Sequence, residues 1–451
     1  MNTIYARIVS LVGLLILLAL AWVLSEDRKH VPWRVIVWGV GLQFVFGLLL
    51  LPTFVQRMVL APVLRGGVWL MTLGRVQVEA QPDELFFRGM QWIVDLLTES
   101  TAAGAEFVFG SLVTDQAIGA QVAFQVLPVI IFVSALAAIL FHLGIIQLLV
   151  RFMAWLMRKS MGTSGAETFG SALLIVLGIE SVTAIREYLR TMTRSELCTV
   201  LTTFMATIAG SVMVVYAGFG VEPGHLLTAS LMSAPAAIVV SKLMVPEQET
   251  PQTTDREAIS IPVDTHNVVD AAAVGASDGL KLALNVGAML IAFIGIVYLI
   301  NAGLALVSQP LLDGIYAPWA EARGWTIPEA ITLKGLVGVV FIPFAFILGT
   351  PLGDVVTVGQ LLGTKTVLNE FLAFIDLQQL GDTLSPRGFT IATYALCGFA
   401  NPGSLGIAIA GVSGLLPDRR PLIVALAVKS FIGGTLACFS TACVAGILIY
   451  A

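Results

Sequence analysis

Gly363-Thr-Lys-Thr-Val-Leu-Asn-Glu-Phe-Leu-Ala-Phe374 decides the fold class, because it places Lys365, Asn369 and Glu370 inside a strongly apolar chain. The 451 residues are 57% hydrophobic and only 12% charged, with a mean hydropathy of +0.92. Ionisable groups at membrane depth are costly unless they face a cavity or a partner. The stretch therefore predicts a solute or ion pathway through a membrane protein.

A second stretch of the same kind, Cys397-Gly-Phe-Ala-Asn-Pro-Gly-Ser-Leu-Gly406, follows later in the chain. It combines helix-breaking glycine and proline with the polar residues Asn401 and Ser404. Inside a bilayer, unwound backbone is tolerated only where it is buried in protein or lines a water-filled cavity. We therefore expect two interrupted helices to meet halfway across the lipid and to form one pocket from Glu370, Asn401 and Ser404.

The composition excludes several classes of protein. This chain has half the usual charge content, so we predict an all-α polytopic membrane protein and not a soluble domain. The net charge of −5 forms no basic block, and no nucleic-acid partner is expected. The four cysteines lie in apolar segments without C-x-x-C spacing, which favours packed thiols over metal sites or disulfides. No hydrolase, metalloprotease or P-loop motif occurs, so neither catalysis nor a cofactor is expected.

Hydrophobic runs long enough to cross a bilayer, about 20 residues each, recur along the chain. We expect about eight transmembrane helices, near residues 8–25, 33–52, 122–149, 197–220, 224–245, 279–308, 386–413 and 421–450. Two further apolar stretches, 164–190 and 330–362, are interrupted by glycine, proline and acidic residues, and we expect re-entrant helical hairpins there. An amphipathic pattern over 86–112 predicts an interfacial helix.

Positive charge predicts how these spans are oriented. Arginine and lysine clusters follow the first and third spans, leave the first hairpin and precede the last span. If these clusters are cytoplasmic, both termini lie outside, the first hairpin enters from the cytoplasmic face and the second from the outer face. Arg57, Arg65, Arg75 and Arg88 then also fall outside, against the rule.

The same order of parts occurs twice, which predicts an inverted repeat. We expect an N-terminal scaffold in residues 1–120, the first half of the core in 121–245, a cytoplasmic linker in 246–278 and the second half in 279–451. Each half contains an interrupted hairpin, a broken span and a complete span, in opposite orientations. Such repeats, with broken helices that meet near the midplane, are the layout of secondary transporters.

Glu370 is the strongest candidate for a solute-binding residue. An ionised carboxylate accepts hydrogen bonds from two vicinal hydroxyls, and the amide of Asn401 both donates and accepts, a pairing suited to a sugar. The alternative for Glu370 is a buried ion pair with Lys365 or another basic group. Glu180, at the tip of the first hairpin, is a second acidic residue at depth, and its alternative role is to cap the following helix.

Two further residues have an ordinary structural alternative. Phe399 is placed to stack on a planar base, although an aromatic ring beside glycine-rich backbone is more often part of the packing. Asp354 is expected to cap the helix that begins at Val355, because carboxylates are stabilised at helix N-termini.

Six stretches resemble the concentrative nucleoside transporter family, in the family's order and over roughly residues 120–450. They are Met161-Gly-Thr-Ser-Gly-Ala-Glu167, Ala206-Thr-Ile-Ala-Gly-Ser-Val212, His225-Leu-Leu-Thr-Ala-Ser-Leu-Met-Ser-Ala-Pro235, Asp270 to Leu290, Gly363 to Phe374 and Cys397 to Gly406. The resemblance implies a homotrimer in the lipid bilayer, with a nucleoside site in each protomer and a cation-coupled, elevator-like movement of the hairpins and broken helices.

The resemblance also implies which residues hold the ribose. In the family these are the Glu of an N-E-F segment and the Asn and Ser of an F-A-N-x-x-S segment. Those positions here are Glu370, Asn401 and Ser404, with Asn369 and Phe399 close by. All of them match the family pattern.

The tip of the first hairpin departs from the family. Similar members carry G-Q-T-E there to read the nucleobase, whereas this chain has Gly178-Ile-Glu-Ser181. Ile179 neither donates to nor accepts from a base edge, so with Glu180 and Ser181 it makes an altered base-facing site. Leu174 stands where the family has a sodium-binding Asn.

The coupling ion is therefore left open between sodium and the proton. A weak sodium site near Ser211, with the carbonyls of Val212 and Leu177, has lost one side-chain oxygen, and a hard cation needs several. A proton would instead be taken up and released by a buried carboxylate, Glu180 or Glu370.

Three functions compete at this point. The first is a cation-coupled nucleoside importer of a bacterial inner membrane. The second is a transporter of a modified nucleoside or a non-nucleoside solute, motivated by the altered hairpin tip. The third is a non-transporting membrane gate or sensor with a degenerate site.

Overall fold

The computed structural model describes residues 3–51, 82–114, 122–253, 265–311, 331–381 and 383–449, in which no β-strand occurs. Seven helices of these ranges are long and apolar enough to cross a membrane. The predicted span over 386–413 is present as two shorter helices. The prediction of an all-helical, multi-pass membrane protein is thereby confirmed. Arg57, Arg65 and Arg75, on which the charge argument partly depends, lie outside the described residues.

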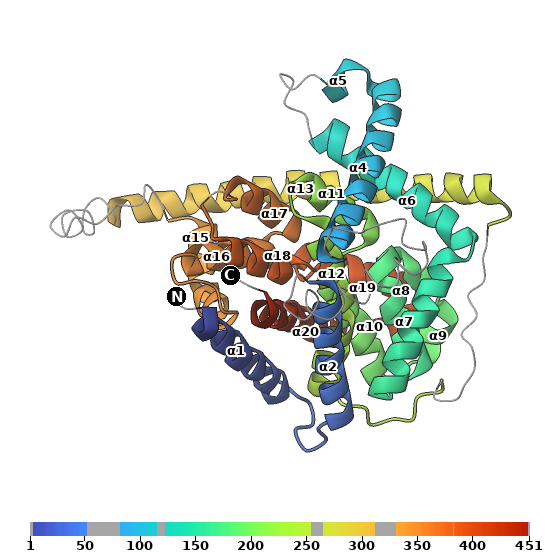
Figure 1. Ribbon diagram of the computed structural model, residues 1–451, viewed down its shortest axis with the longest axis vertical. Coiled ribbons are helices and arrows are strands. Elements are labelled where there is room, and N and C mark those ends of the chain that lie inside the picture. Colours follow the sequence, from blue (N-terminus) through green and yellow to red (C-terminus); the bar gives the residue numbers. More distant parts are fainter. Residues whose placement is uncertain are drawn as a thin grey trace, which may run out of the picture.

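In residues 3–51 and 82–114, which the structure describes before the first half of the core, there are four helices. They are α1 (Thr3–Val23), α2 (Trp33–Leu50), α4 (Pro82–Phe109) and α5 (Ser111–Thr114). The predicted interfacial helix over 86–112 corresponds to α4, which projects with α5 from one end of the molecule (Figure 1). In contrast, α1 packs against α20 and α2 against α12, so the N-terminal pair contacts both halves of the core.

The described elements of the two predicted halves of the core follow one another along the chain. The first half consists of η3 (Val122–Val126), α6 (Leu127–His142), α7 (Ile145–Met161), α8 (Gly165–Leu177), η4 (Ile179–Thr183), α9 (Arg186–Thr191), α10 (Arg194–Ala206), α11 (Gly210–Gly218) and α12 (Pro223–Met244). The second half consists of α13 (Val268–Leu311), α15 (Leu333–Ile347), α16 (Val355–Val367), α17 (Glu370–Gln379), α18 (Pro386–Leu396), α19 (Pro402–Leu415), η6 (Pro417–Arg419) and α20 (Arg420–Leu448). In both halves a helical reversal precedes a span that is broken in the middle.

The second hairpin differs from the predicted range. The stretch 330–362 contains α15 and the first part of α16, which pack along each other. The chain then reverses again at Leu368 and Asn369, and α17 packs back on α16. The tip of the second hairpin is therefore at Asn369. The apolar helix α16 ends just before this asparagine, which caps α17.

The long helix α13 crosses α6 at two glycines (Figure 1). A Cβ atom on Gly275 would lie 2.6 Å from the carbonyl oxygen of Ser134, and one on Gly279 would lie 2.8 Å from Cα of Ile131. Since glycines four residues apart share one helix face, they let the two backbones approach closely, as small residues do in membrane proteins.

The segments predicted to be cytoplasmic gather at one end of the bundle. The carboxylate of Glu26, which follows α1, accepts hydrogen bonds from Arg194 at 2.7 Å and Lys429 at 2.6 Å. Arg419 donates to the carbonyl oxygens of Leu189 and Met192 at the end of the first hairpin. Loops from both halves therefore meet on a single face, and its cytoplasmic location stays a prediction.

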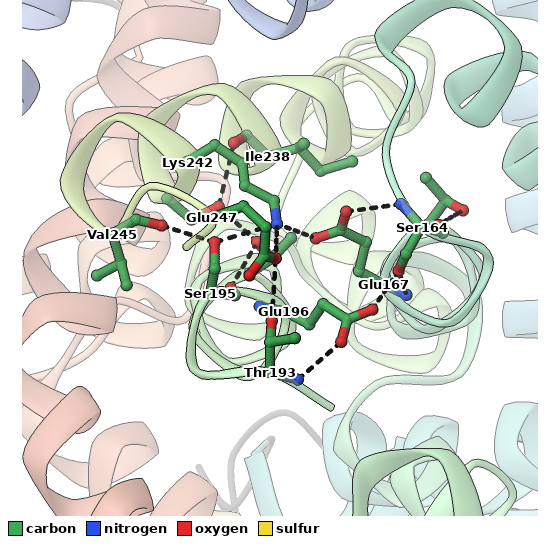
Figure 2. A network of polar contacts seen from close by, with 12 residues as sticks. Ser164, Glu167, Thr193, Ser195, Glu196, Ile238, Lys242, Val245 and Glu247 are labelled. Carbon is green, nitrogen blue, oxygen red and sulfur yellow. Dashed lines mark hydrogen bonds and ion pairs between the residues drawn. The ribbon is translucent and has the colours of Figure 1, made fainter. Parts of the chain in front are cut away.

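A buried polar network fixes the base of the first hairpin at this end (Figure 2). The ammonium of Lys242 in α12 lies 2.8 Å from Oε2 of Glu167 and 3.0 Å from Oε2 of Glu247, and donates to Ser195 Oγ at 3.0 Å. Lys242 and Glu167 are almost fully buried. The pair therefore ties α8 to α12 through an interaction that water does not screen.

Two capping boxes extend the network and join the helices that begin there. Ser164 and Glu167 cap α8, whereas Thr193 and Glu196 cap α10. The hydroxyl of Ser164 also donates to the carboxylate of Glu196, which couples the two caps (Figure 2). Orphan N–H groups at two helix starts are thereby satisfied within a dry interface.

Candidate functional site

The two broken spans touch at their breaks. Residues 207–209 between α10 and α11 and residues 397–401 between α18 and α19 are not helical. A Cβ atom on Gly398 would lie 2.9 Å from the carbonyl oxygen of Ala206, so only glycine allows this approach. The Cys438 sulfur lies 3.5 and 3.4 Å from the carbonyl oxygens of Ala206 and Cys397, so its single S–H is shared between two groups that the breaks expose.

Two helices begin beside these breaks, each capped by an asparagine. The side-chain oxygen of Asn369 accepts from the backbone N–H of Leu372 at 2.9 Å, and that of Asn401 accepts from Ser404 at 2.8 Å. The N-termini of α17 and α19 lie close together, because Asn401 at the start of α19 donates a hydrogen bond to Glu370 at the start of α17. Because helix N-termini carry partial positive charge, they favour an anionic group between them.

Glu370 is that anionic group. It is the first residue of α17, and its side chain is buried, with 6% of the residue exposed. Its Oε1 accepts a hydrogen bond from the Tyr216 hydroxyl at 2.8 Å, and its Oε2 accepts one from Asn401 Nδ2 at 2.7 Å. Both partners are neutral donors, so the carboxylate is held without a cationic side chain.

A cavity of about 90 Å³ lies beside this carboxylate. It is lined by residues from both hairpin tips and both broken spans, together with α6 and α13: Ile130, Gly178, Ile179, Phe204, Ala209, Val212, Tyr216, Leu282, Val286, Met289, Asn369, Glu370, Phe371, Phe399, Asn401, Ser404 and Ile407. One end is polar and the rest is mostly aliphatic and aromatic. The site thus suits a solute with a hydroxyl-rich part and a less polar part.

The sequence-predicted residues divide between this cavity and a second one next to it. The second cavity has a volume of about 230 Å³ and lies between α6, α13 and the first hairpin. Leu177, Ser181 and Ser211 line it, and Leu282 borders both cavities. Of the predicted cation-coupling residues, Leu177 and Ser211 line the second cavity, whereas Val212 and Glu370 line the first.

Two sequence-based alternatives can now be corrected. Lys365 forms no ion pair with Glu370; instead its buried ammonium donates to the carbonyl oxygen of Ala395 at 2.8 Å. Asp354 precedes α16 but its carboxylate does not cap that helix, because it accepts from the hydroxyl and backbone N–H of Ser385 at the start of α18. Each of these groups thus joins two elements of the second half.

Other predicted residues have mixed outcomes. Phe399 packs against Phe204, with ring centroids 5.7 Å apart, and also lines the cavity, whereas its stacking on a base stays a prediction. Glu180 lies in η4, and its side chain is outside what the structure describes. All four cysteines are free and buried, as expected for packed thiols.

Sequence reasoning missed Tyr216. Its side chain is fully buried, stacks on Phe374 with centroids 4.5 Å apart, and meets Phe371 edge-on. In the sequence it is one aromatic residue in an apolar run, which is the usual pattern of a packed core. The sequence offers one indirect signal. Phe371 and Phe374 are three residues apart and so lie on one face of a helix that begins at Glu370, which predicts an aromatic partner on that face.

Comparisons with known proteins agree with this geometry. Family models described as Na+-dependent nucleoside transporter N-terminus, nucleoside recognition and Na+-dependent nucleoside transporter C-terminus match residues 12–76, 123–223 and 225–446. Similar proteins include the uncharacterized transporter YutK of Bacillus subtilis, 35% identical over 97% of this chain and 98% of its own, and an uncharacterized transporter of Haemophilus influenzae, also 35% identical, over 98% and 97%.

Mammalian and solved relatives give the same result. The chain is 37% identical to solute carrier family 28 member 3 of Mus musculus, although it spans only 59% of that protein's length. The structure of CNTnw in an inward-facing substrate-bound state is similar with a TM-score of 0.81 and 31% identity, covering 98% of this chain and 97% of that one. A CNTnw variant in an outward-facing state gives a TM-score of 0.80 at 30% identity, with the same coverage of both chains.

Proposed function

Because this chain belongs to the Na+-dependent nucleoside transporter family, we propose that it is a secondary active transporter that imports nucleosides across a bacterial inner membrane, driven by a cation gradient. The observation that carries the proposal is the convergence of Glu370, Asn401 and Ser404 on one cavity. A buried carboxylate with free acceptor positions beside an amide suits the hydroxyls of a ribose.

The two ends of the cavity are assigned to the two parts of a nucleoside. Glu370, Asn401 and Ser404 hold the ribose, with Asn369 beside them. The base lies toward the first hairpin tip and Phe399, whose ring offers an apolar face. This assignment is supported by the cavity lining, which is polar at the Glu370 end and apolar near Ile179.

A second candidate solute is a modified nucleoside or a related ligand. Ile179 lines the cavity where similar proteins are expected to present hydrogen-bonding side chains. A hydrogen-bonding side chain at this place would lose its partner, at a cost in binding free energy, when the base lacks a matching polar edge. The aliphatic side chain of Ile179 has no such group to leave unpaired, so it tolerates such bases. With Glu180 and Ser181 on the same tip, it makes base selectivity the property in which this chain differs from its family.

The coupling ion is either sodium or the proton, and different residues support each. Ser211 lines the second cavity close to Leu177, in keeping with a sodium site, and the family is described as sodium-dependent. However, Leu174 has a fully buried aliphatic side chain that supplies no oxygen. For proton coupling, Glu370 or Glu180 would carry the proton during transport.

The assembly and movement are part of the same proposal. The 44-residue helix α13 presents exposed apolar side chains such as Ile291 and Tyr298, 79% and 74% exposed, which suit contact with lipid or with other protomers of a homotrimer. We retain the division into residues 1–120, 121–245, 246–278 and 279–451, with elevator-like movement of the hairpins and broken helices. Within the scaffold, α1 packs on α20 and α2 on α12.

Gradient-driven flux into proteoliposomes tests this function. We expect accumulation of labelled uridine or adenosine when an inward cation gradient is imposed. Replacing sodium abolishes accumulation if sodium couples, whereas a protonophore abolishes it if the proton couples. Flux of a modified nucleoside alone would favour the second candidate, and binding without accumulation under either gradient would indicate a gate or sensor.

A further inference from the structure

The Tyr216 hydroxyl is the one polar group from the first half of the core that hydrogen-bonds to Glu370 among the described contacts. Its ring is held between the stacked Phe374 and the edge of Phe371, and the residue is fully buried. Glu370 is the hydroxyl's hydrogen-bond acceptor, at 2.8 Å. The phenol therefore has a fixed direction, set by packing and not by its own rotation.

The hydrogen bonds to Glu370 leave acceptor capacity on both oxygens. An ionised carboxylate has about four acceptor positions, two on each oxygen. Tyr216 occupies one on Oε1 and Asn401 one on Oε2. The Asn401 amide is itself fixed, because its oxygen caps α19. Each carboxylate oxygen thus has one neutral side-chain donor, and no other described side chain occupies its second acceptor position.

We infer that Tyr216 is a positioning residue: it fixes the plane of the Glu370 carboxylate so that one free acceptor position on each oxygen faces the cavity and receives one of two adjacent hydroxyls. This inference rests on the proposed function and refines its substrate class to nucleosides with a vicinal diol. Without the phenol, Oε2 keeps the remaining side-chain hydrogen bond, from Asn401, and the carboxylate can rotate about the bond to its side chain. The two acceptor positions then no longer match the spacing of the two hydroxyls.

The test compares wild type with Tyr216→Phe, which keeps the ring, its stacking and its volume. Initial rates in proteoliposomes would be measured for uridine, 2′-deoxyuridine and 3′-deoxyuridine. The matched control is Tyr394→Phe, because Tyr394 is also fully buried but its hydroxyl lies 3.3 Å from His225 Nδ1. We expect Tyr216→Phe to raise the KM for uridine by about tenfold or more, as for loss of a hydrogen bond to a charged group, with Vmax changed less than about threefold.

The deoxy analogues separate positioning from a merely structural role. An analogue that lacks the hydroxyl bound to Oε1 does not benefit from a correctly oriented Glu370 carboxylate. For at least one analogue, the increase in KM caused by Tyr216→Phe should therefore be several-fold smaller than the increase for uridine. Equal losses for all three substrates, or an unchanged KM for uridine, would overturn the inference. If Tyr216→Phe does not fold, wild type decides: equal KM values for uridine and both analogues contradict two-point acceptance. Absence of any nucleoside flux in wild type would instead refute the proposed function itself.

Discussion

Asn401 Nδ2 lies 2.7 Å from Glu370 Oε2, and this hydrogen bond joins the start of α19 to the start of α17. Each residue also has a role in its own helix, because Asn401 caps α19 and Glu370 opens the first turn of α17. The contacts that fix the starts of these two helices therefore also fix the two side chains that face the solute. A change in either side chain is expected to affect solute binding before it affects the fold.

Glu370→Gln should reduce nucleoside uptake by at least about 100-fold, because two or more hydrogen bonds to a charged acceptor are weakened together. Glutamine supplies one acceptor oxygen where the structure uses two. Its amide nitrogen must then face a donor, Tyr216 or Asn401. Uptake by proteoliposomes is the measurement, with Glu222→Gln, a half-exposed site at the start of α12, as the matched control. Wild-type uptake by Glu370→Gln would contradict the assigned role.

Asn401→Asp should abolish uptake at neutral pH while α19 stays capped. The aspartate keeps an acceptor for the Ser404 N–H, but it sets a second carboxylate beside Glu370, and two carboxylates this close do not both ionise readily. Asn401→Ala removes cap and donor together and should also lower stability by about 1 kcal/mol. Thermal unfolding in detergent and KM, measured on both variants, separate the two effects. An aspartate variant with the wild-type KM would exclude the donor role of Asn401.

The sequence indicates the site where helices are broken, and fails where the site depends on packing. Gly398 and the Asn401-Pro402 pair mark the second break directly, since both disfavour a continuing helix. Glu370 and Asn401 were predicted because polar groups in an apolar chain are conspicuous. Tyr216 was not, because its role depends on α11 lying against α17, a long-range contact without a periodic pattern. The alternative of an ion pair between Lys365 and Glu370 is wrong for a similar reason. The two residues are close in sequence, but the Lys365 ammonium donates to the carbonyl oxygen of Ala395, a contact between distant parts of the chain.

Glu26 should give the cytoplasmic end a pH-dependent stability. The hydrogen bond from Arg194, with help from Lys429, lowers the pKa of Glu26 from 4.5 to about 2. A lowered folded-state pKa means that the stabilisation is fully present above pH 4.5 and is lost as pH falls toward 2. The difference in unfolding temperature between wild type and Glu26→Gln should therefore be constant above pH 5 and vanish near pH 2. Because the pair is partly exposed, the difference should correspond to less than about 1 kcal/mol; a difference that grows on acidification would contradict this assignment.

Lys242→Met should be strongly destabilising, by about 3–5 kcal/mol, because it leaves the buried Glu167 carboxylate without its cation. Adding Glu167→Gln should restore most of the loss, since the remaining acidic partner of Lys242, Glu247, is more exposed and can be hydrated. Lys281→Met is the control: its pair with Asp278 is largely exposed, and it should change stability by less than about 0.5 kcal/mol. Thermal unfolding of wild type and these three variants in one detergent measures how far the Glu167→Gln change offsets the Lys242→Met loss. If the double variant is as unstable as Lys242→Met alone, the ion pair is not what ties α8 to α12.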